Sequence, residues 1–477
     1  MGHARAIRGF VLAVALLLGG RCAAEDAPET LKLTACTLPD IGETARCGVL
    51  EVPEDPDRPA GRQLPIHVAV LPATSGSALP DPIAVLMGGP GEDAIGAAAD
   101  YADQFAALRQ DRDLLFVDQR GTGQSAPLHC DLFSPGDAAA SLRDVFPLAA
   151  VAACETRLAG AADLTRYDYP YFARDLEQIR RALGYGKLNL FAGSYGTRAA
   201  QVYLRAYPDS VRTAYLGSVV PLDVSTPLSF AHTAQSALDR LFDDCHADPA
   251  CQSTYPALRD EVTELLARLD AGQILVTVPA HAERVPLSRG RVAEWIRAKL
   301  YRPKSSTDLP WLLHRAFAGD AQPVAEDILG NAREADGALS FGLLFAITCN
   351  EDVPFIQDGE VAPQTAGTVF GDYRLRQQQA ACASWPRSPL PEGYRKPIAT
   401  AVPTLFVTGE LDGDTPLWFT GRVAAGFSEQ AIIVAHGQGH TEWSDCLAAR
   451  YAQLLRSGTV RGLDTNCPAL ARPPFKT

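Results

Sequence analysis

Short apolar runs alternate along the first half of the chain with segments of helical periodicity. The apolar runs lie at residues 48–53, 64–71, 82–87, 113–118, 187–191 and 213–220, and turn-forming residues bound them, which predicts strands. Residues 94–109, 171–183 and 197–204 have the spacing of amphipathic helices. Strands and helices that alternate in this way predict an α/β fold, with a mostly parallel sheet covered by helices on both faces.

The pattern changes after residue 222. Residues 223–400 are mainly helical, as at 231–242, 258–269 and 289–300, and clear strand patterns return only at 403–408 and 431–435. A helical block inserted late in a sheet predicts a cap over the carboxyl edge of that sheet, where open α/β sheets bind ligands. We therefore expect a core formed by residues 25–222 and 401–477, with the cap at 223–400.

The amino terminus has the features of a secretory leader. Arg5 and Arg8 precede an apolar stretch at 10–18, which is too short to span a bilayer, and small residues follow it. This predicts a signal peptide at 1–24, cleavage near Ala24, and a secreted or periplasmic protein. Acylation of Cys22 is an alternative, against which Arg21 argues because a small residue is expected there.

Cysteine usage and charge narrow the class of protein. Without Cys22, ten of the eleven cysteines remain, and an even number in an exported chain predicts disulfides. The cysteine spacing suggests no metal site, and we expect no cofactor. A net charge of −13 argues against nucleic acid and anionic membranes as partners, and we expect no stable membrane insertion. The oligomeric state stays open. The simplest connectivity joins neighbours: Cys36 with Cys47, Cys130 with Cys154, Cys245 with Cys251, Cys349 with Cys382, and Cys446 with Cys467.

Residues 192–196, Ala-Gly-Ser-Tyr-Gly, stand between a predicted strand and a predicted helix. A small-x-Ser-x-Gly turn in this context is a nucleophile elbow, which lifts a serine hydroxyl above the sheet edge. Ala192 replaces the usual first glycine and is also small. The motif assigns Ser194 as the nucleophile.

A serine nucleophile needs a base, and the base needs an acid to orient it. A candidate acid follows the predicted strand at 403–408, and a candidate histidine follows the predicted strand at 431–435, which is the order found in α/β-hydrolases. Position favours Asp412 over Asp414 and Glu410. It favours His440 over His436, which is too close to its strand.

An oxyanion hole needs two backbone N–H groups aimed at the developing negative charge. We expect one from Tyr195, directly after the nucleophile. We expect the other from Gly89, in the Gly-Gly-Pro-Gly run at 88–91.

Together these motifs resemble the prolyl and tripeptidyl aminopeptidase family of α/β-hydrolase serine peptidases. The resemblance rests on 88–91 (GGPG), 118–125 (DQRGTGQS), 193–197 (GSYGT), 412–416 (DGDTP) and 439–441 (GHT). The leader, the cysteine pairs, Tyr195 and residues 347–352 favour the secreted tripeptidyl branch. Met87 departs from the histidine of the prolyl enzymes. The resemblance also implies that Asp118 and Arg120 brace the loops around the site.

The resemblance implies peptide substrates with a free N-terminus, cleaved near that end. Buried carboxylates of the cap would hold the α-ammonium, since a charge-assisted contact rejects substrates that lack the charge. Glu351 and Asp352 are the candidates, and the alternative is that they form a solvated acidic pair. The alternative function is that of a secreted carboxylesterase or lipase with the same triad.

Overall fold

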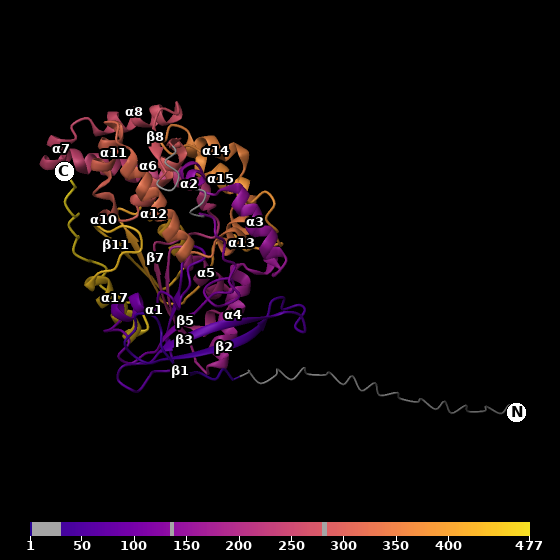
Figure 1. Cartoon of the computed structure of the whole chain (residues 1–477). Coiled ribbons are helices and arrows are strands. Elements are labelled where there is room, and N and C mark those ends of the chain that lie inside the picture. Colours follow the sequence, from indigo (N-terminus) through magenta and orange to yellow (C-terminus); the bar gives the residue numbers. More distant parts are fainter. Residues whose placement is uncertain (2–29, 134–137, 279–283) are drawn as a thin grey trace.

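A nine-stranded sheet and a layer of helices above its edge make up the molecule (Figure 1). The computed structural model describes residues 1, 30–133, 138–278 and 284–477. The predicted leader, with Cys22 and Ala24, falls on residues outside this range. None of the helices in the described ranges is long and apolar enough to cross a membrane.

The strand order is β1-β2-β3-β5-β4-β6-β7-β10-β11. From β5 onward neighbouring strands are parallel, whereas β1, β2 and β3 pair antiparallel, and β3 also runs antiparallel to β5. The predicted fold class, an α/β-hydrolase fold with a mostly parallel sheet, is confirmed. The strands are β1 (Thr34–Cys36), β2 (Ala45–Pro53), β3 (Gln63–Leu71), β4 (Ile83–Leu86), β5 (Leu114–Val117), β6 (Leu188–Gly193), β7 (Val211–Gly217), β10 (Thr404–Gly409) and β11 (Gln430–Ala435).

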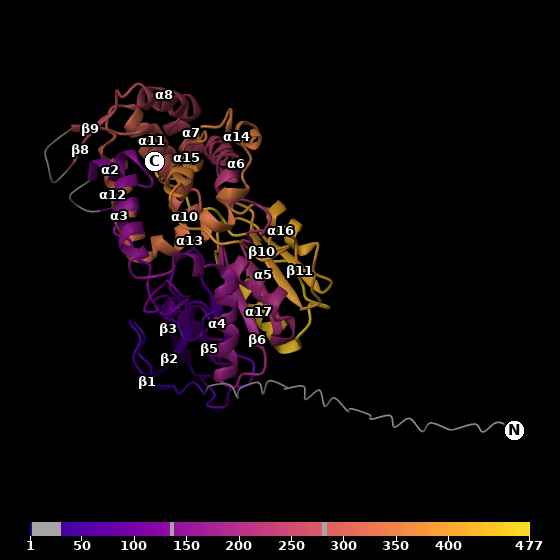
Figure 2. The same cartoon turned by 90° about the vertical axis from the view of Figure 1, so that its right-hand side faces the viewer.

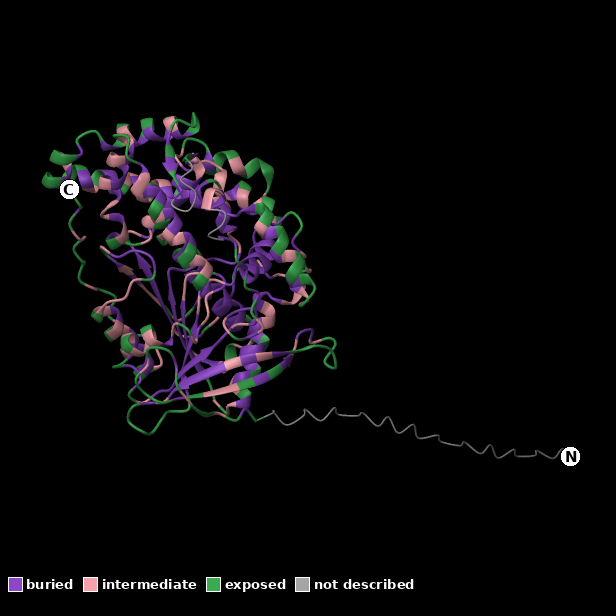
Figure 3. Ribbon diagram, in the orientation of Figure 1, coloured by how far each residue is buried: buried purple, intermediate pink, exposed green. Residues whose placement is uncertain are grey.

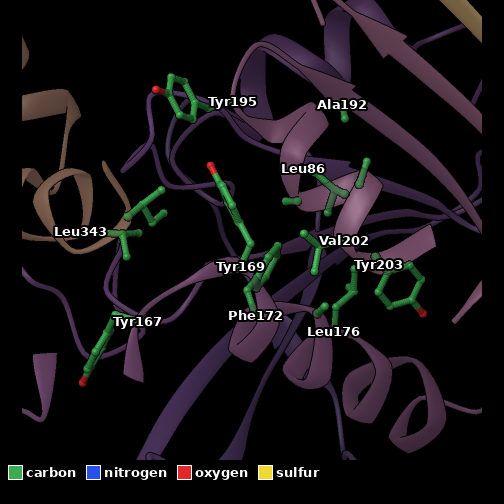
Figure 4. Packing of buried hydrophobic residues seen from close by; sticks show 14 of the residues in the cluster. Leu86, Tyr167, Tyr169, Phe172, Leu176, Ala192, Tyr195, Val202, Tyr203 and Leu343 are labelled. Carbon is green, nitrogen blue, oxygen red and sulfur yellow. The ribbon is translucent and has the colours of Figure 1, made fainter. Parts of the chain in front are cut away.

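Helices cover both faces of the sheet because side chains alternate along each buried strand. On β6, Leu190 and Ala192 pack with helices α4 (Tyr169–Ala182) and α5 (Gly196–Ala206), whereas Phe191 packs on the opposite face with α1 (Ala98–Gln104) and α17 (Asp445–Ser457). Figure 3 shows the central strands buried, and Figure 4 shows side chains of β4, α4 and α5 packed together beneath Tyr195. The elbow serine therefore stands on a rigid, close-packed base.

The segment between β7 and β10 forms the mainly helical cap. It has a hydrophobic core of its own, which contains Leu241, Trp295 and Ile328. The short hairpin β8 (Leu275–Thr277) and β9 (Arg284–Pro286) was not predicted, because three-residue strands leave little periodicity. The cap helices are α6 (Thr226–Ala247), α7 (Pro249–Thr254), α8 (Leu258–Asp270), α9 (Arg289–Lys299), α10 (Pro303–Ser306), α11 (Leu309–Phe317), α12 (Gln322–Ala338), α13 (Phe341–Glu351), α14 (Asp358–Thr365) and α15 (Tyr373–Ala381).

Two helices from before the elbow also join the upper layer. Helices α2 (Ala138–Arg143) and α3 (Leu148–Ala159) follow β5 and lie beside α12 and α13 (Figure 2). The remaining helix of the core, α16 (Leu417–Ala424), follows β10. Short 3₁₀ turns occur at Leu164–Arg166, Pro208–Ser210 and Val353–Phe355.

Five disulfides join neighbouring cysteines, so the predicted connectivity is confirmed. They link Cys36 to Cys47, Cys130 to Cys154, Cys245 to Cys251, Cys349 to Cys382, and Cys446 to Cys467. Each closes a loop within one part of the fold, at most 33 residues apart in sequence.

The C-terminal tail, residues 459–477, runs from α17 up to the cap (Figure 1). The N–H of Leu470 donates to the carbonyl oxygen of His436, in the core, at 3.0 Å. Further on, the Lys476 N–H donates to Thr307 O at 3.0 Å, and Phe475 is buried in the core of the cap. The tail thus connects the two layers a second time.

Candidate active site

The elbow places Ser194 in a conformation that L-residues rarely adopt. Its φ is 54°, in the left-handed region, which costs a non-glycine residue roughly 1–2 kcal/mol. The turn is crowded: a Cβ on Gly196 would lie 2.3 Å from the carbonyl oxygen of Leu86, and one on Gly193 would lie 3.2 Å from Cγ2 of Thr441. Because the backbone of β4 approaches so closely, only glycine fits at position 196, which explains the last residue of the elbow motif.

Asp412 and His440 form a buried, hydrogen-bonded pair. Oδ2 of Asp412 lies 2.9 Å from Nδ1 of His440. The carboxylate also accepts hydrogen bonds from Thr415, from its N–H at 2.9 Å and from its hydroxyl at 2.6 Å. Asp412 is therefore fixed by its own loop and oriented toward the imidazole.

The two groups stabilise each other's charge. Burial disfavours the charged imidazole, but ionised Asp412 and its hydrogen bond outweigh this effect and raise the pKa of His440 above its ordinary value. Burial likewise opposes ionisation of Asp412, yet His440 and Thr415 together hold the pKa of that carboxyl below its usual range. This is the electrostatic arrangement of a base held by its acid.

The alternative acids and the alternative histidine are engaged elsewhere. Asp414 is ion-paired with Arg297 of the cap. Glu410 lies 3.4 Å from His436, whose side chain is 55% exposed. The structure thus brings Asp412 and His440 together, as position in the sequence favoured, and sets the other three apart from them.

The glycine run after β4 packs directly against the elbow. An added Cβ on Gly88 would lie 3.2 Å from Cβ of Ser194 and 3.5 Å from Oε2 of Glu92. Within the described chain, the N–H groups of Gly89 and Tyr195 have no internal hydrogen-bond acceptor. Two free donors beside a serine are what an oxyanion hole requires.

Asp118 and Arg120 brace the surrounding loops. Oδ1 of Asp118 accepts hydrogen bonds from the N–H groups of Ala94 and Ile95 at 3.1 and 2.9 Å. Arg120 donates to both carboxylate oxygens of Asp175, at 2.7 and 2.8 Å, in the buried space beside α4. Asp118 thus holds the segment that follows the glycine run, whereas Arg120 holds its own loop against α4.

A cavity of about 940 Å³ lies between the sheet edge and the cap. Ser194, Gly89, Tyr195 and His440 line it from the core, and residues of α9, α12, α13 and α15 line it from the cap. The cap thereby encloses the space in front of the serine.

Glu351 and Asp352 lie behind the wall of this cavity and are fully buried. Asp352 forms an ion pair with Arg198 of α5 at 3.0 Å and accepts a hydrogen bond from the Tyr195 hydroxyl at 3.1 Å. Glu351 accepts one from the Tyr394 hydroxyl at 2.5 Å. Both carboxylates therefore have internal partners, and neither lines the cavity.

A different carboxylate does line the cavity. Glu92 follows the glycine run, and its Oε2 accepts a hydrogen bond from the Gly88 N–H at 3.2 Å. Burial raises the pKa of Glu92, although the charges of nearby His440 and Arg302 act in the opposite direction. The sequence places Glu92 directly after a catalytic motif, and this position is the signal that could have identified it.

The sheet, the elbow and the Asp412–His440 pair define the protein as an α/β-hydrolase, and thus as an enzyme. Residues 81–274 match the family model described as alpha/beta hydrolase fold, and residues 367–467 match the model described as TAP-like protein. The chain has the α/β-hydrolase fold, and it is similar to tripeptidyl and prolyl aminopeptidases.

Three curated relatives illustrate this similarity. The serine protease Hip1 of Mycobacterium tuberculosis is 26% identical over 464 residues, which cover 89% of this chain and 87% of the relative. The tripeptidyl aminopeptidase of Streptomyces lividans is 24% identical over 486 residues, covering 91% and 86%. The proline iminopeptidase of Aeromonas sobria is 27% identical over 246 residues, covering 49% and 48%.

Proposed function

We propose that this protein is an exported serine aminopeptidase of the tripeptidyl or prolyl type, which cleaves peptides near a free N-terminus. The observation that carries the proposal is the buried Asp412–His440 pair, with 2.9 Å between Oδ2 and Nδ1, in one cavity with the elbow residue Ser194. Relatives named as peptidases that match nearly the whole chain support a peptide substrate.

The chemistry is acyl transfer through Ser194. His440 takes the hydroxyl proton as Oγ attacks the scissile carbonyl carbon, and Asp412 orients and stabilises the resulting imidazolium. The N–H groups of Gly89 and Tyr195 bind the oxyanion of the tetrahedral intermediate. His440 then protonates the leaving amine, and a water molecule activated by the same imidazole releases the acyl group.

The cap makes the enzyme an exopeptidase. A cavity covered by α9, α12 and α13 limits how much chain extends beyond the cleaved bond. The α-ammonium of the substrate then needs an anionic partner, and Glu92 is a carboxylate of the cavity wall beside the elbow. In this scheme residues 25–222 and 401–477 carry the catalytic groups, and residues 223–400 select the substrate.

Export is part of the proposal. Five disulfides fit an extracellular protein, since such bonds persist in oxidising compartments. A leader at 1–24, removed near Ala24, would deliver the chain there, and mass spectrometry of the secreted protein would show the new N-terminus. An intact Met1 on the active protein would contradict export through a cleaved leader.

The test is hydrolysis of a matched panel of substrates. We expect turnover of single-residue or tripeptide chromogenic amides with a free N-terminus, and much weaker turnover of their acetylated forms and of short-chain esters. Ser194→Ala should abolish turnover and labelling by a fluorophosphonate, whereas Ser236→Ala, at an exposed serine of α6, should retain both. Glu92→Gln should reduce the difference in kcat/KM between free and acetylated peptides. Glu326→Gln, at an exposed residue, is the control and should leave that difference unchanged.

Two results would overturn the proposal. Equal cleavage of free and acetylated peptides would remove the aminopeptidase assignment. Esters that are far better substrates than all amides would indicate a carboxylesterase or lipase instead.

A further inference from the structure

Four arginines line the cavity in front of Ser194, and three of them lie on helices α9 and α15 of the cap. Arg291 and Arg297 come from α9, and Arg374 comes from α15, a helix more than 70 residues later in the chain. Arg291 and Arg297 are each only 8% exposed. Charged side chains are seldom buried without a partner, so each of these three guanidinium groups is expected to have an anion beside it.

Two carboxylates face the three guanidinium groups. Glu294 binds Arg297 through both of its oxygens, at 2.5 and 3.0 Å, and lies 3.4 Å from Nε of Arg374. The second carboxylate, Asp414, pairs with Arg297 alone. The charge of Arg297 is therefore neutralised by two carboxylates, whereas Arg291 and Arg374 have only Glu294, already bound to Arg297, as a nearby anion in the described chain.

Arg291 has hydrogen-bond donors to spare. Its Nε donates to the carbonyl oxygen of Ser141 at 2.8 Å, and its two Nη groups have no acceptor among the residues that the structure describes. Burial lowers the pKa of Arg291, and neighbouring Glu294 and Tyr373 offset this only in part.

Arg374 is in a similar position. One Nη donates to Oε1 of Gln378 at 2.7 Å, and the buried Nε lies 3.4 Å from Oε1 of Glu294 without forming a hydrogen bond. Its guanidinium lies over the ring of Phe146, 4.7 Å from the centroid. Burial lowers its pKa as well. The aromatic contact fixes the plane of the group but does not supply an anion.

We propose that Arg291 and Arg374 form a subsite that binds a carboxylate of the substrate. The proposal rests on the proposed function and specifies its substrate class: peptides that carry either an acidic side chain or a nearby C-terminal carboxylate. Guanidinium groups bind carboxylates in a bidentate manner, and Arg291, which has unused donors, lines the cavity that would hold the peptide.

The charges of the cavity also give the substrate a direction. The elbow side carries Glu92, Asp93 and Asp100 against one cation, Arg302, which donates to the carbonyl oxygen of His440. The cap side carries the other three arginines against Glu294 and Asp414. An α-ammonium is attracted to the first and repelled by the second. The carboxylate-bearing part of the peptide therefore points toward α9 and α15.

The experiment compares three peptides of equal length with free N-termini. The first has glutamine at the varied position and a C-terminal amide, the second has glutamate there, and the third has glutamine and a free C-terminal carboxylate. We expect kcat/KM to be about ten- to a hundred-fold higher for the second or the third than for the first, the size of one charge-assisted contact. Whichever of the two is preferred identifies the source of the carboxylate.

Matched variants connect the preference to the two arginines. Arg291→Gln and Arg374→Gln should bring the ratio of acidic to neutral kcat/KM close to one. Arg289→Gln is the control. Arg289 lies in the same turn of α9, but it pairs with Asp270 at 3.3 Å and does not line the cavity, so this variant should keep the wild-type ratio. Unchanged fluorophosphonate labelling of Ser194 shows that a variant has folded.

Equal kcat/KM for all three peptides in the wild type overturns the subsite, and so does a ratio that survives in both arginine variants. If the wild type hydrolyses none of the peptides, the proposed function fails separately. The subsite is then decided by calorimetric binding of the same peptides to Ser194→Ala and to its Arg291→Gln double variant.

Discussion

At the scale of single residues, the roles proposed for Asp412 and His440 predict how activity depends on pH. The pKa of His440 is raised, and the imidazole must be neutral to accept the proton of Ser194. We expect kcat/KM to fall as the pH drops through this pKa, with a midpoint above 6.5, the ordinary value for histidine. A pH–rate profile with an unblocked amide measures it.

Asp412→Asn is the matched variant for that profile. The amide leaves the geometry nearly unchanged but removes the charge that favours the imidazolium, so activity should fall by about 10⁴-fold. Asp414→Asn changes a carboxylate two residues away that pairs with Arg297, and its effect should be far smaller. The reverse order of effects would transfer the orienting role to Asp414.

Glu351 makes the stability of the fold depend on pH. Burial, with neighbouring Asp168 adding to it, raises the pKa of Glu351 to about 8. The folded protein then holds a proton that the unfolded chain releases near pH 4.3, so the free energy of unfolding decreases as the pH rises from there to about 8 and levels off above.

Glu351→Gln tests this dependence. The variant keeps the shape of the side chain but has no proton to lose, so its melting temperature should decrease less than that of the wild type between pH 5 and 8. Thermal melts of both proteins across that range measure the difference. Parallel curves would show that Glu351 is already ionised in the folded state.

At the scale of elements, the end of α13 supports the start of α5. Asp352 pairs with Arg198 at 3.0 Å and binds the Tyr195 hydroxyl, so it fixes the residue whose N–H would face the oxyanion. Removing one partner of a buried ion pair typically costs about 3–5 kcal/mol.

Asp352→Asn should therefore lower the free energy of unfolding by an amount in that range and reduce kcat for free and acetylated peptides alike. Urea denaturation and steady-state kinetics measure the two effects. A variant of wild-type stability with a raised KM for free peptides only would instead restore Asp352 as an ammonium ligand.

The sequence predicts those features that depend on local pattern. The elbow around Ser194, the glycine run at 88–91 and the positions of Asp412 and His440 after the last two strands each follow from a few adjacent residues. Helix and strand positions in the core agree with the structure for the same reason, since buried strands and amphipathic helices leave clear periodicities.

Features that depend on how elements meet could not be predicted. Nothing near Glu351 and Asp352 in the sequence indicates that Arg198 pairs with Asp352 or that the Tyr394 hydroxyl donates to Glu351. The cluster of Arg291 and Arg374 likewise exists only because α9 and α15 meet above the elbow. The sequence therefore predicts catalytic residues that lie within one motif, whereas the pairing of charged residues between helices depends on how the helices pack.

At the scale of the whole molecule, the C-terminal tail connects the cap to the core. Phe475 is buried in the core of the cap, and Arg472 pairs with Asp244 of α6 at 2.8 Å. Phe475→Ala should destabilise the cap by about 3 kcal/mol and increase amide hydrogen exchange in α8 and α11. Leu470→Ala, at a half-exposed tail residue, is the control and should leave exchange in both helices unchanged.

The order of the disulfides bears on how the chain is made. Reading from Cys36 to Cys467, each cysteine is joined to the next one along, and no pair encloses or crosses another. If the chain is exported as proposed and emerges from a membrane channel amino end first, the first free thiol that the leading cysteine of each pair meets is its native partner. An oxidant that simply joins thiols as they appear would produce the native set, without an isomerase to correct it.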